Sequence, residues 1–309
     1  MLEGGQQRRL DQISLQIGNG RTAIVGLSGA GKTSLLNVLA GFETPTRGRL
    51  TLAQQPSDHP LFRYWVPQNA GLWPHVRLID HLTSVIERTA DAEIHKKSDE
   101  ILAAFDLRHR ANAFPDELSQ GERSRLALAR ALMAGPRVLL ADEPLAHVDI
   151  VRKPEFWKVV DEWIDRSAGS LVFSSHEPEV VLQYADRIIV MEKGSVIFDG
   201  AVSDLYDNPP DQRCAMFLGP VSWFTTEQLA ALRIPHQNKD RGIRPERITL
   251  SECASGDCVV VQSTPSGYFQ ETRLQHVTHG FELNVIHRGL RLLSPKTQVS
   301  IILDRVFDS

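Results

Sequence analysis

The stretch Gly26-Leu27-Ser28-Gly29-Ala30-Gly31-Lys32-Thr33 matches the pattern G-x-x-x-x-G-K-[ST]. An apolar run over 22–25 precedes it and predicts a strand, while the spacing over 34–40 predicts a helix that Gly41 can end. A glycine-rich loop between a strand and a helix lets backbone amides converge on phosphate oxygens at the positive end of the helix. The alternative is a tight glycine turn with a surface lysine, which the full pattern in this context disfavours. We therefore expect a triphosphate-binding loop.

The polar residues of this loop have separate chemical roles. We expect Lys32 to neutralise the β- and γ-phosphates and the Thr33 hydroxyl to ligate Mg²⁺. The motif alone indicates only a nucleoside triphosphate, because kinases, GTPases and motor proteins share it. The expected nucleotide-binding residues of the loop and the helix start are Gly26, Ser28, Gly29, Ala30, Gly31, Lys32, Thr33 and Ser34.

Two acidic residues follow a second apolar run. Val138-Leu139-Leu140-Ala141 is typical of a strand buried on both faces of a parallel sheet, and Asp142 and Glu143 come directly after it. Asp142 at the strand tip is suited to hold Mg²⁺ through water, and Glu143 is suited to polarise the attacking water. Two solvated acids at a strand end are the simpler alternative, and a nearby phosphate loop weakens it.

A further segment, Leu118-Ser119-Gln120-Gly121-Glu122, makes the chemistry more specific. Ser119 comes where a helix is expected to begin, so its hydroxyl, the Gly121 amide and the helix dipole can face an anion. The segment resembles the LSGGQ-type signature of ABC ATPases, with Gln and Glu as variants at its third and fifth positions. Taken alone, Ser119 and Glu122 would equally make an ordinary capping box.

The resemblance covers residues 13 to about 218 and extends to three further positions. Gln68 resembles the Q-loop glutamine, Asp149 the D-loop aspartate, and His176 the switch histidine. The resemblance implies that Gln68 senses Mg²⁺ and couples to membrane subunits, and that His176 contacts the γ-phosphate. It implies catalytic roles for Lys32, Gln68, Glu143 and His176, a Mg²⁺ site of Thr33, Gln68 and Asp142, and nucleotide contacts from Ser119, Gly121 and Asp149.

The resemblance also implies a dimer. Ser119 and Gly121 of one ATPase subunit would contact the γ-phosphate of the ATP that Lys32 of a second subunit holds. One subunit cannot then build a complete site, so ATP joins two copies and hydrolysis separates them. We expect a homodimer that uses ATP and Mg²⁺.

The length of 309 residues, of which 42% are hydrophobic, suits two domains. Alternating buried strands and helices predict an α/β fold over 1–218, a P-loop NTPase of the ABC type with a helical subdomain at about 73–134. After Pro209-Pro210, short strand-like runs predict a small all-β domain over 219–309. The net charge of −4 does not favour a nucleic-acid partner. Since no run is long and apolar enough to span a bilayer, membrane work would require partners.

Two segments resemble features of importer ATPases. Leu72-Trp73-Pro74-His75 is similar to an LFPH-type stretch near the groove that receives the membrane subunit, and Arg244-Pro245-Glu246 is similar to the entry of a TOBE-type regulatory domain. This implies solute uptake at the cytoplasmic face of the membrane, with transmembrane permease subunits and an extracytoplasmic solute-binding protein as partners. An exporter ATPase, or a soluble ABC-type ATPase without a transport role, remains the alternative.

The start of the chain departs from the family pattern. ABC ATPases usually begin with an extra strand and an aromatic residue that stacks on adenine, and residues 2–7 contain no aromatic side chain. We therefore expect the first strand and the stacking contact to be missing. A start codon placed too late and a natural shortening both account for this, and we favour the first.

Overall fold

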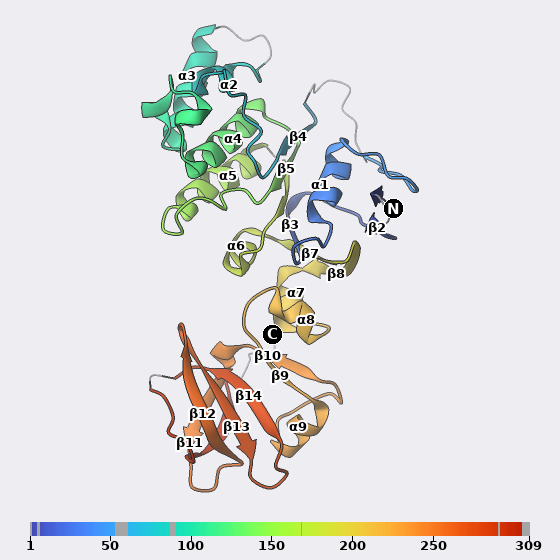
Figure 1. The fold of residues 1–309 in the computed structure, drawn as a ribbon, viewed down its shortest axis with the longest axis vertical. Helices are drawn as coiled ribbons and strands as arrows, with labels where there is room; N and C mark the ends of the chain where they lie inside the picture. The colour runs from blue at the N-terminus through green and yellow to red at the C-terminus, as the bar shows by residue number, and fades with distance from the viewer. Residues whose placement is uncertain are drawn as a thin grey trace. The chain divides into compact units, whose positions relative to one another are not determined.

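The computed structural model describes residues 2–4, 7–52, 61–86, 91–167, 169–289 and 291–304. The chain divides into two compact units, residues 1–200 and 201–309 (Figure 1). The boundary expected from the sequence, after residue 218, lies inside the second unit. Within the described ranges, no helix is long and apolar enough to cross a membrane.

The first unit is built on a mainly parallel sheet. Six described strands lie in the order β4-β5-β6-β3-β7-β8, and the pairs β4–β5, β5–β6, β6–β3 and β3–β7 are parallel. The central strands are apolar because they are buried on both faces, as expected for residues 138–141. The strands are β3 (Gly20–Val25), β4 (Arg63–Val66), β5 (Val138–Asp142), β6 (Ser170–Ser174), β7 (Arg187–Glu192) and β8 (Ser195–Ala201).

Helices follow most of these strands. They are α1 (Lys32–Ala40), α2 (Leu78–Thr83), α3 (Asp91–Ala104), α4 (Gln120–Ala134), α5 (Lys153–Ser167) and α6 (Pro178–Tyr184), with 3₁₀ turns at Arg108–Arg110 and Pro115–Glu117. Helix α1 ends at Gly41 with φ of 84° and α4 at Gly135 with φ of 61°, both left-handed caps. Helix α4 packs against α2, α3 and β4, so the helical region predicted at 73–134 is joined to the sheet edge (Figure 1).

Two expectations for the first residues are wrong. The alternation of apolar and polar residues over 13–17 predicts a strand, but these residues form none; Ile13, Leu15 and Ile17 are half-buried and pack on the core. Alternating hydrophobicity indicates which side chains are buried, but not whether the backbone pairs with another strand. This segment lies on the core without strand hydrogen bonds. A first strand is also present: β1 (Leu2–Gly4) pairs antiparallel with β2 (Gln7–Leu10). The side chains of residues 1–8, including any contact with a base, lie outside the described ones.

The second unit contains an antiparallel sheet. Its described strands lie in the order β11-β15-β12-β13-β14, and β9 pairs with β10 in a separate ribbon. The strand-like runs of the sequence, at 259–262, 269–274, 281–286 and 298–303, coincide with β12, β13, β14 and β15, whereas β11 was not predicted. The elements are α7 (Val202–Asp207), α8 (Gln212–Met216), β9 (Ser222–Phe224), α9 (Thr226–Ala231), β10 (Arg241–Ile243), a 3₁₀ turn at Pro245–Arg247, β11 (Ile248–Glu252), β12 (Cys258–Ser266), β13 (Phe269–His276), β14 (Glu282–His287) and β15 (Gln298–Leu303).

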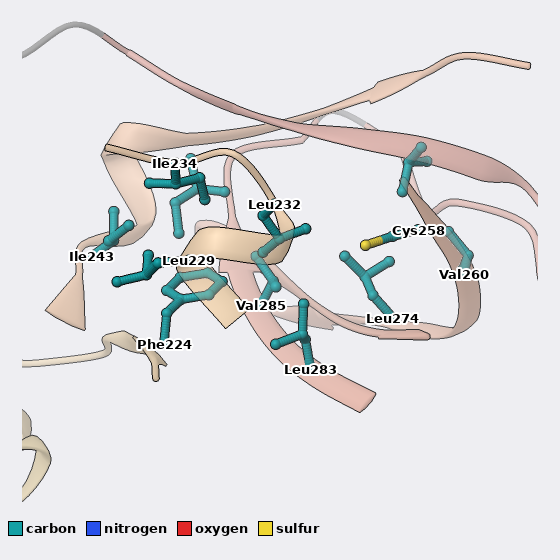
Figure 2. Packing of buried hydrophobic residues seen from close by; sticks show 12 residues of the cluster. Phe224, Leu229, Leu232, Ile234, Ile243, Cys258, Val260, Leu274, Leu283 and Val285 are labelled. Atoms are coloured by element: carbon teal, nitrogen blue, oxygen red, sulfur yellow. The ribbon is translucent and has the colours of Figure 1, made fainter. Parts of the chain in front are cut away.

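An apolar cluster joins the antiparallel sheet of the second unit to α9 and β9. Leu229 of α9 and Phe224 of β9 pack with Val285 and Leu274 from the inner face of the sheet (Figure 2). Residues on β13 alternate between buried and exposed, which is the period of a half-buried strand. The helix therefore closes the core over one face of the sheet.

Arg244, the arginine of the Arg-Pro-Glu segment, is buried in this unit and binds backbone. Its guanidinium donates to the carbonyls of Tyr206 at 3.2 Å, Ala215 at 3.1 Å, Gly219 at 3.1 Å and Pro220 at 3.2 Å. Burial lowers its pKa, while the Tyr206 and Glu246 side chains oppose that shift. Arg244 therefore fastens the helical start of this unit to the residues that lead into β11.

Candidate active site

The phosphate-binding loop lies between the end of β3 and the start of α1. A Cβ on Gly26 would lie 2.5 Å from the Met191 carbonyl oxygen, and one on Gly31 would lie 2.8 Å from that of Arg9. Both glycines also have positive φ, 157° and 105°. Both positions therefore require glycine, because a side chain would clash and because the backbone is left-handed. At Gly26 the loop backbone packs closely against β7.

Lys32 and Thr33, at the start of α1, point to opposite parts of the site. Lys32 Nζ donates to the carbonyls of Gly26 at 2.7 Å and Leu27 at 3.3 Å, so the ammonium lies across the loop. The Thr33 hydroxyl donates to Asp142 Oδ2 at 2.7 Å. The structure therefore brings the loop motif and the acid at the tip of β5 together, as the sequence implied.

Ser174 organises the two acids and was missed by sequence reasoning. Its hydroxyl donates to Asp142 Oδ1 and accepts a hydrogen bond from the Glu143 amide at 2.9 Å. Ser174 is fully buried at the end of β6, where it is the register partner of Asp142 on β5. The available signal was a polar residue ending a buried strand, but only the strand order makes it a neighbour of Asp142.

Glu143 lies between two of the other predicted residues. Its Oε2 accepts from Gln68 Nε2 at 3.2 Å, and its Oε1 lies 3.1 Å from His176 Nδ1. Glu143 has a φ of 50°, a left-handed conformation that is rare for a residue with a side chain and is enriched at functional sites. The structure thus gathers Lys32, Thr33, Gln68, Asp142, Glu143 and His176 at one edge of the sheet.

The signature segment meets the capping-box geometry. Ser119 Oγ accepts from the Glu122 amide at 3.2 Å, and Glu122 Oε2 accepts from the Ser119 amide at 2.8 Å. Partial burial raises the pKa of Glu122, but the hydrogen bonds from Ser119 hold it below its ordinary value. Among the described residues, no hydrogen bond or ion pair joins Ser119 or Gly121 to the cluster around Glu143.

Gly121 is fixed by a different neighbour. A Cβ on it would lie 2.8 Å from the carbonyl oxygen of His147, in the segment that leads to Asp149. The Asp149 side chain is exposed, and its carbonyl accepts the amides of Arg152 at 2.9 Å and Lys153 at 3.0 Å. The D-loop therefore touches the signature helix of the same chain, while Asp149 faces solvent.

Trp73 belongs to a stack beside the loop that carries Gln68. Its ring lies 5.3 Å from that of His81, and the Arg130 guanidinium lies 5.2 Å from its centroid. Arg130 also donates to the Gly71 carbonyl at 2.9 Å. Trp73 nevertheless remains 49% exposed, which leaves apolar surface for the contact predicted from sequence.

Comparisons with known proteins agree with this geometry. The family model described as "ABC transporter" matches residues 10–146. The glucose import ATP-binding protein of Saccharolobus solfataricus is 33% identical over 80% of this chain and 76% of its own length. The Fe(3+) ions import ATP-binding protein of Serratia marcescens is 32% identical over 95% of this chain and 92% of its own length.

A solved structure shares the fold of the first unit. It is a dimeric ATP-binding cassette in a post-hydrolysis state bound to ADP and Pi, with a TM-score of 0.59 and 24% identity. The match covers 65% of this chain and 94% of that one. At this identity the likeness establishes the fold alone.

Proposed function

The chain belongs to the ATP-binding subunits of ABC transporters, and from that premise we propose that it hydrolyses ATP to drive solute uptake. The observation that carries the proposal is the cluster around Glu143, in which the phosphate loop, both acids, Gln68 and His176 meet. The relatives named above are import ATP-binding proteins, so an exporter or a soluble ATPase without a transport role is not favoured.

Each residue of the cluster has a task in ATP hydrolysis. Lys32 and the loop amides hold the β- and γ-phosphates, and Glu143 accepts a proton from the attacking water as general base. Gln68 and His176, which already contact the Glu143 carboxylate, orient the water and the γ-phosphate. This assignment places the general base beside the phosphate loop without further rearrangement of the strands.

The oxygen ligands near Thr33 are of the kind that magnesium ions prefer. The Thr33 hydroxyl and the Asp142 carboxylate, 2.7 Å apart, are hard oxygen ligands, and we propose the Gln68 amide oxygen as a third. When bound, Mg²⁺ would neutralise charge on the β- and γ-phosphates. The chain's own part is to position these oxygens, with Ser174 holding Asp142 in place.

A second copy of this chain would complete the site. Within one chain, no described hydrogen bond or ion pair joins Ser119 or Gly121 to the Glu143 cluster, and we assign their phosphate contact to the ATP held by a second molecule. Large apolar side chains in the phosphate loop and after Asp149 are exposed, namely Leu27 by 72%, Ile150 by 74% and Val151 by 83%. A homodimer that encloses two ATP molecules would cover such groups.

The wider assembly follows from the family. We place the subunit at the cytoplasmic face of the membrane, bound to permease subunits through the surface that includes Trp73. An extracytoplasmic solute-binding protein would deliver the solute. The antiparallel unit is proposed to be a TOBE-like regulatory domain, with Arg244 in a structural role.

Steady-state hydrolysis by Glu143→Gln tests the proposed function. Loss of the general base should lower kcat roughly 10²–10⁴-fold while ATP binding persists. Glu162→Gln, on the exposed face of α5, is the matched control and should behave like the unaltered chain. Normal turnover by Glu143→Gln would remove Glu143 from the role of base, and no hydrolysis by the unaltered chain would contradict the ATPase assignment.

A further inference from the structure

One half-buried ion pair, between Lys153 and Glu177, connects two segments of the site that the roles above leave separate. Lys153 Nζ lies 2.6 Å from Glu177 Oε1 and also contacts Oε2. The Lys153 residue is only 8% exposed. Burial of a lysine this deep is uncommon unless a partner satisfies its charge, so the pair has a specific geometry and little freedom.

Lys153 ties this pair to the D-loop. It is the first residue of α5, and its amide donates to the Asp149 carbonyl at 3.0 Å. Two further turns connect Asp149 back to Glu143: the Val148 amide binds the Leu145 carbonyl at 3.0 Å, and the Ala146 amide binds that of Glu143 at 3.2 Å. A displacement of the D-loop backbone would therefore also displace Lys153.

Glu177 ties the other end of the pair to the switch histidine. It is the N-cap of α6, yet its carboxylate caps no amide of that helix. The Ser175 hydroxyl instead accepts the Glu177 amide at 3.0 Å, which leaves both carboxylate oxygens with Lys153. A glutamate at a helix start would ordinarily face the free amides, so this arrangement favours the ion pair.

His176 needs such support. Its side chain is 61% exposed, so packing does not fix the ring that lies 3.1 Å from Glu143. Its orientation depends on the backbone of 175–177, which the Lys153–Glu177 contact anchors. The contacts thus close a ring from Glu143 through Asp149, Lys153, Glu177 and His176 back to the Glu143 carboxylate.

We propose that Lys153 and Glu177 are positioning residues that couple the D-loop to His176, so that a shift at Asp149 moves the histidine relative to Glu143. The inference rests on the proposed ATPase function and deepens it. The exposed Asp149, Ile150 and Val151 would meet a second copy, and this ion pair would carry that contact to the hydrolytic cluster.

The test compares Glu177→Gln, Lys153→Met and the charge swap Lys153→Glu/Glu177→Lys with the unaltered chain. Glu177→Gln keeps the shape of the side chain, so it is the variant that separates positioning from folding. Misplacing His176 should lower kcat roughly 10–100-fold. KM for ATP and binding of ATP should stay unchanged, because the phosphate loop is intact. The swap should recover much of the lost kcat.

Lys158→Met is the matched control, since Lys158 is a lysine on the same helix with 77% side-chain exposure. Its kcat should equal that of the unaltered chain, and circular dichroism at the assay temperature gives the folded fraction by which every kcat is corrected. Unchanged kcat in Glu177→Gln, or a swap that recovers nothing, would overturn the coupling while leaving the ATPase intact. Absence of hydrolysis in the unaltered chain would instead contradict the proposed function.

Discussion

Gly121 shows how a single residue can be constrained by two requirements. Its amide belongs to the signature segment, and its α-carbon faces the His147 carbonyl with no space for a side chain. In a free helix, alanine would be favoured over glycine by about 1 kcal/mol. Here the added methyl would press on the D-loop, so the local preference and the tertiary contact oppose each other.

We expect Gly121→Ala to lower ATP turnover at least tenfold without stabilising the first unit, because the D-loop must move away from the helix. Steady-state kinetics and thermal unfolding measure the two effects. Gln120→Ala, one position earlier on the same helix, should leave turnover near normal. A Gly121→Ala chain that is more stable and fully active would show that the D-loop tolerates the displacement.

The sequence predicted those candidate site residues that stand in local motifs. Lys32, Thr33, Asp142 and Glu143 could be recognised because a loop, a strand end and their spacing are written in consecutive residues. Ser174, Lys153 and Glu177 could not, because their partners lie at the ends of other elements. Only the parallel register of β5 with β6 makes Ser174 a neighbour of Asp142.

Elements of both units contain buried histidines with lowered pKa values. Burial lowers the pKa of His81 on α2 and of His287 on β14 below the ordinary value of 6.5, while backbone hydrogen bonds partly oppose the shifts. Each ring has a hydrogen bond at Nε2: His81 accepts the Trp73 amide at 2.9 Å, and the Thr272 hydroxyl lies 2.9 Å from His287 Nε2. A proton on His81 Nε2 would remove the acceptor of the Trp73 amide, and burial disfavours the charged form of both rings.

The unfolded chain therefore binds more protons than the native one as pH falls below 6.5. The free energy of unfolding should decline in that range, because a depressed histidine pKa stabilises the native state only while the unfolded histidine is neutral. Urea unfolding between neutral and mildly acidic pH measures the slope. His287→Gln should make the slope of the second unit shallower, and the exposed-residue control His95→Gln should not. An unchanged slope in His287→Gln would contradict this account.

Arg244 connects α7, α8 and the residues before β11, so replacing it should affect how these elements hold together. Lysine cannot reproduce the four hydrogen bonds of the guanidinium to backbone carbonyls. Arg244→Lys should destabilise the second unit by about 2–4 kcal/mol, measured by chemical unfolding. Arg241→Lys, at an exposed position on β10, is the control. Equal stability of the two variants would mean that the buried contacts are dispensable.

Strands could be predicted from the sequence where the hydrophobic pattern and the backbone hydrogen bonding agree. The apolar runs at β5, β6 and β7 are strands because a buried backbone must pair. Residues 13–17 alternate between half-buried and exposed side chains instead, and they form no ladder. The change in hydrophobic pattern after Pro209-Pro210 predicted an α/β domain followed by an all-β domain. The order in which the strands pair within each sheet could not be predicted.

At the scale of the whole molecule, the central claim is that two copies share each nucleotide. One chain supplies the loop with Lys32 and the cluster around Glu143, and a second chain is proposed to supply Ser119 and Gly121. Glu143→Gln should retain ATP, so it should accumulate the joined form. A bulky charged side chain at Ser119 should block joining without touching the phosphate loop.

Light scattering after size-exclusion chromatography, with and without Mg²⁺ and ATP, tests this claim most directly. Glu143→Gln should be monomeric without nucleotide and dimeric with it. Glu143→Gln/Ser119→Arg should bind ATP with unchanged affinity yet remain monomeric. A double variant that dimerises as readily as Glu143→Gln, or that loses ATP binding as a monomer, would contradict a site shared between two copies.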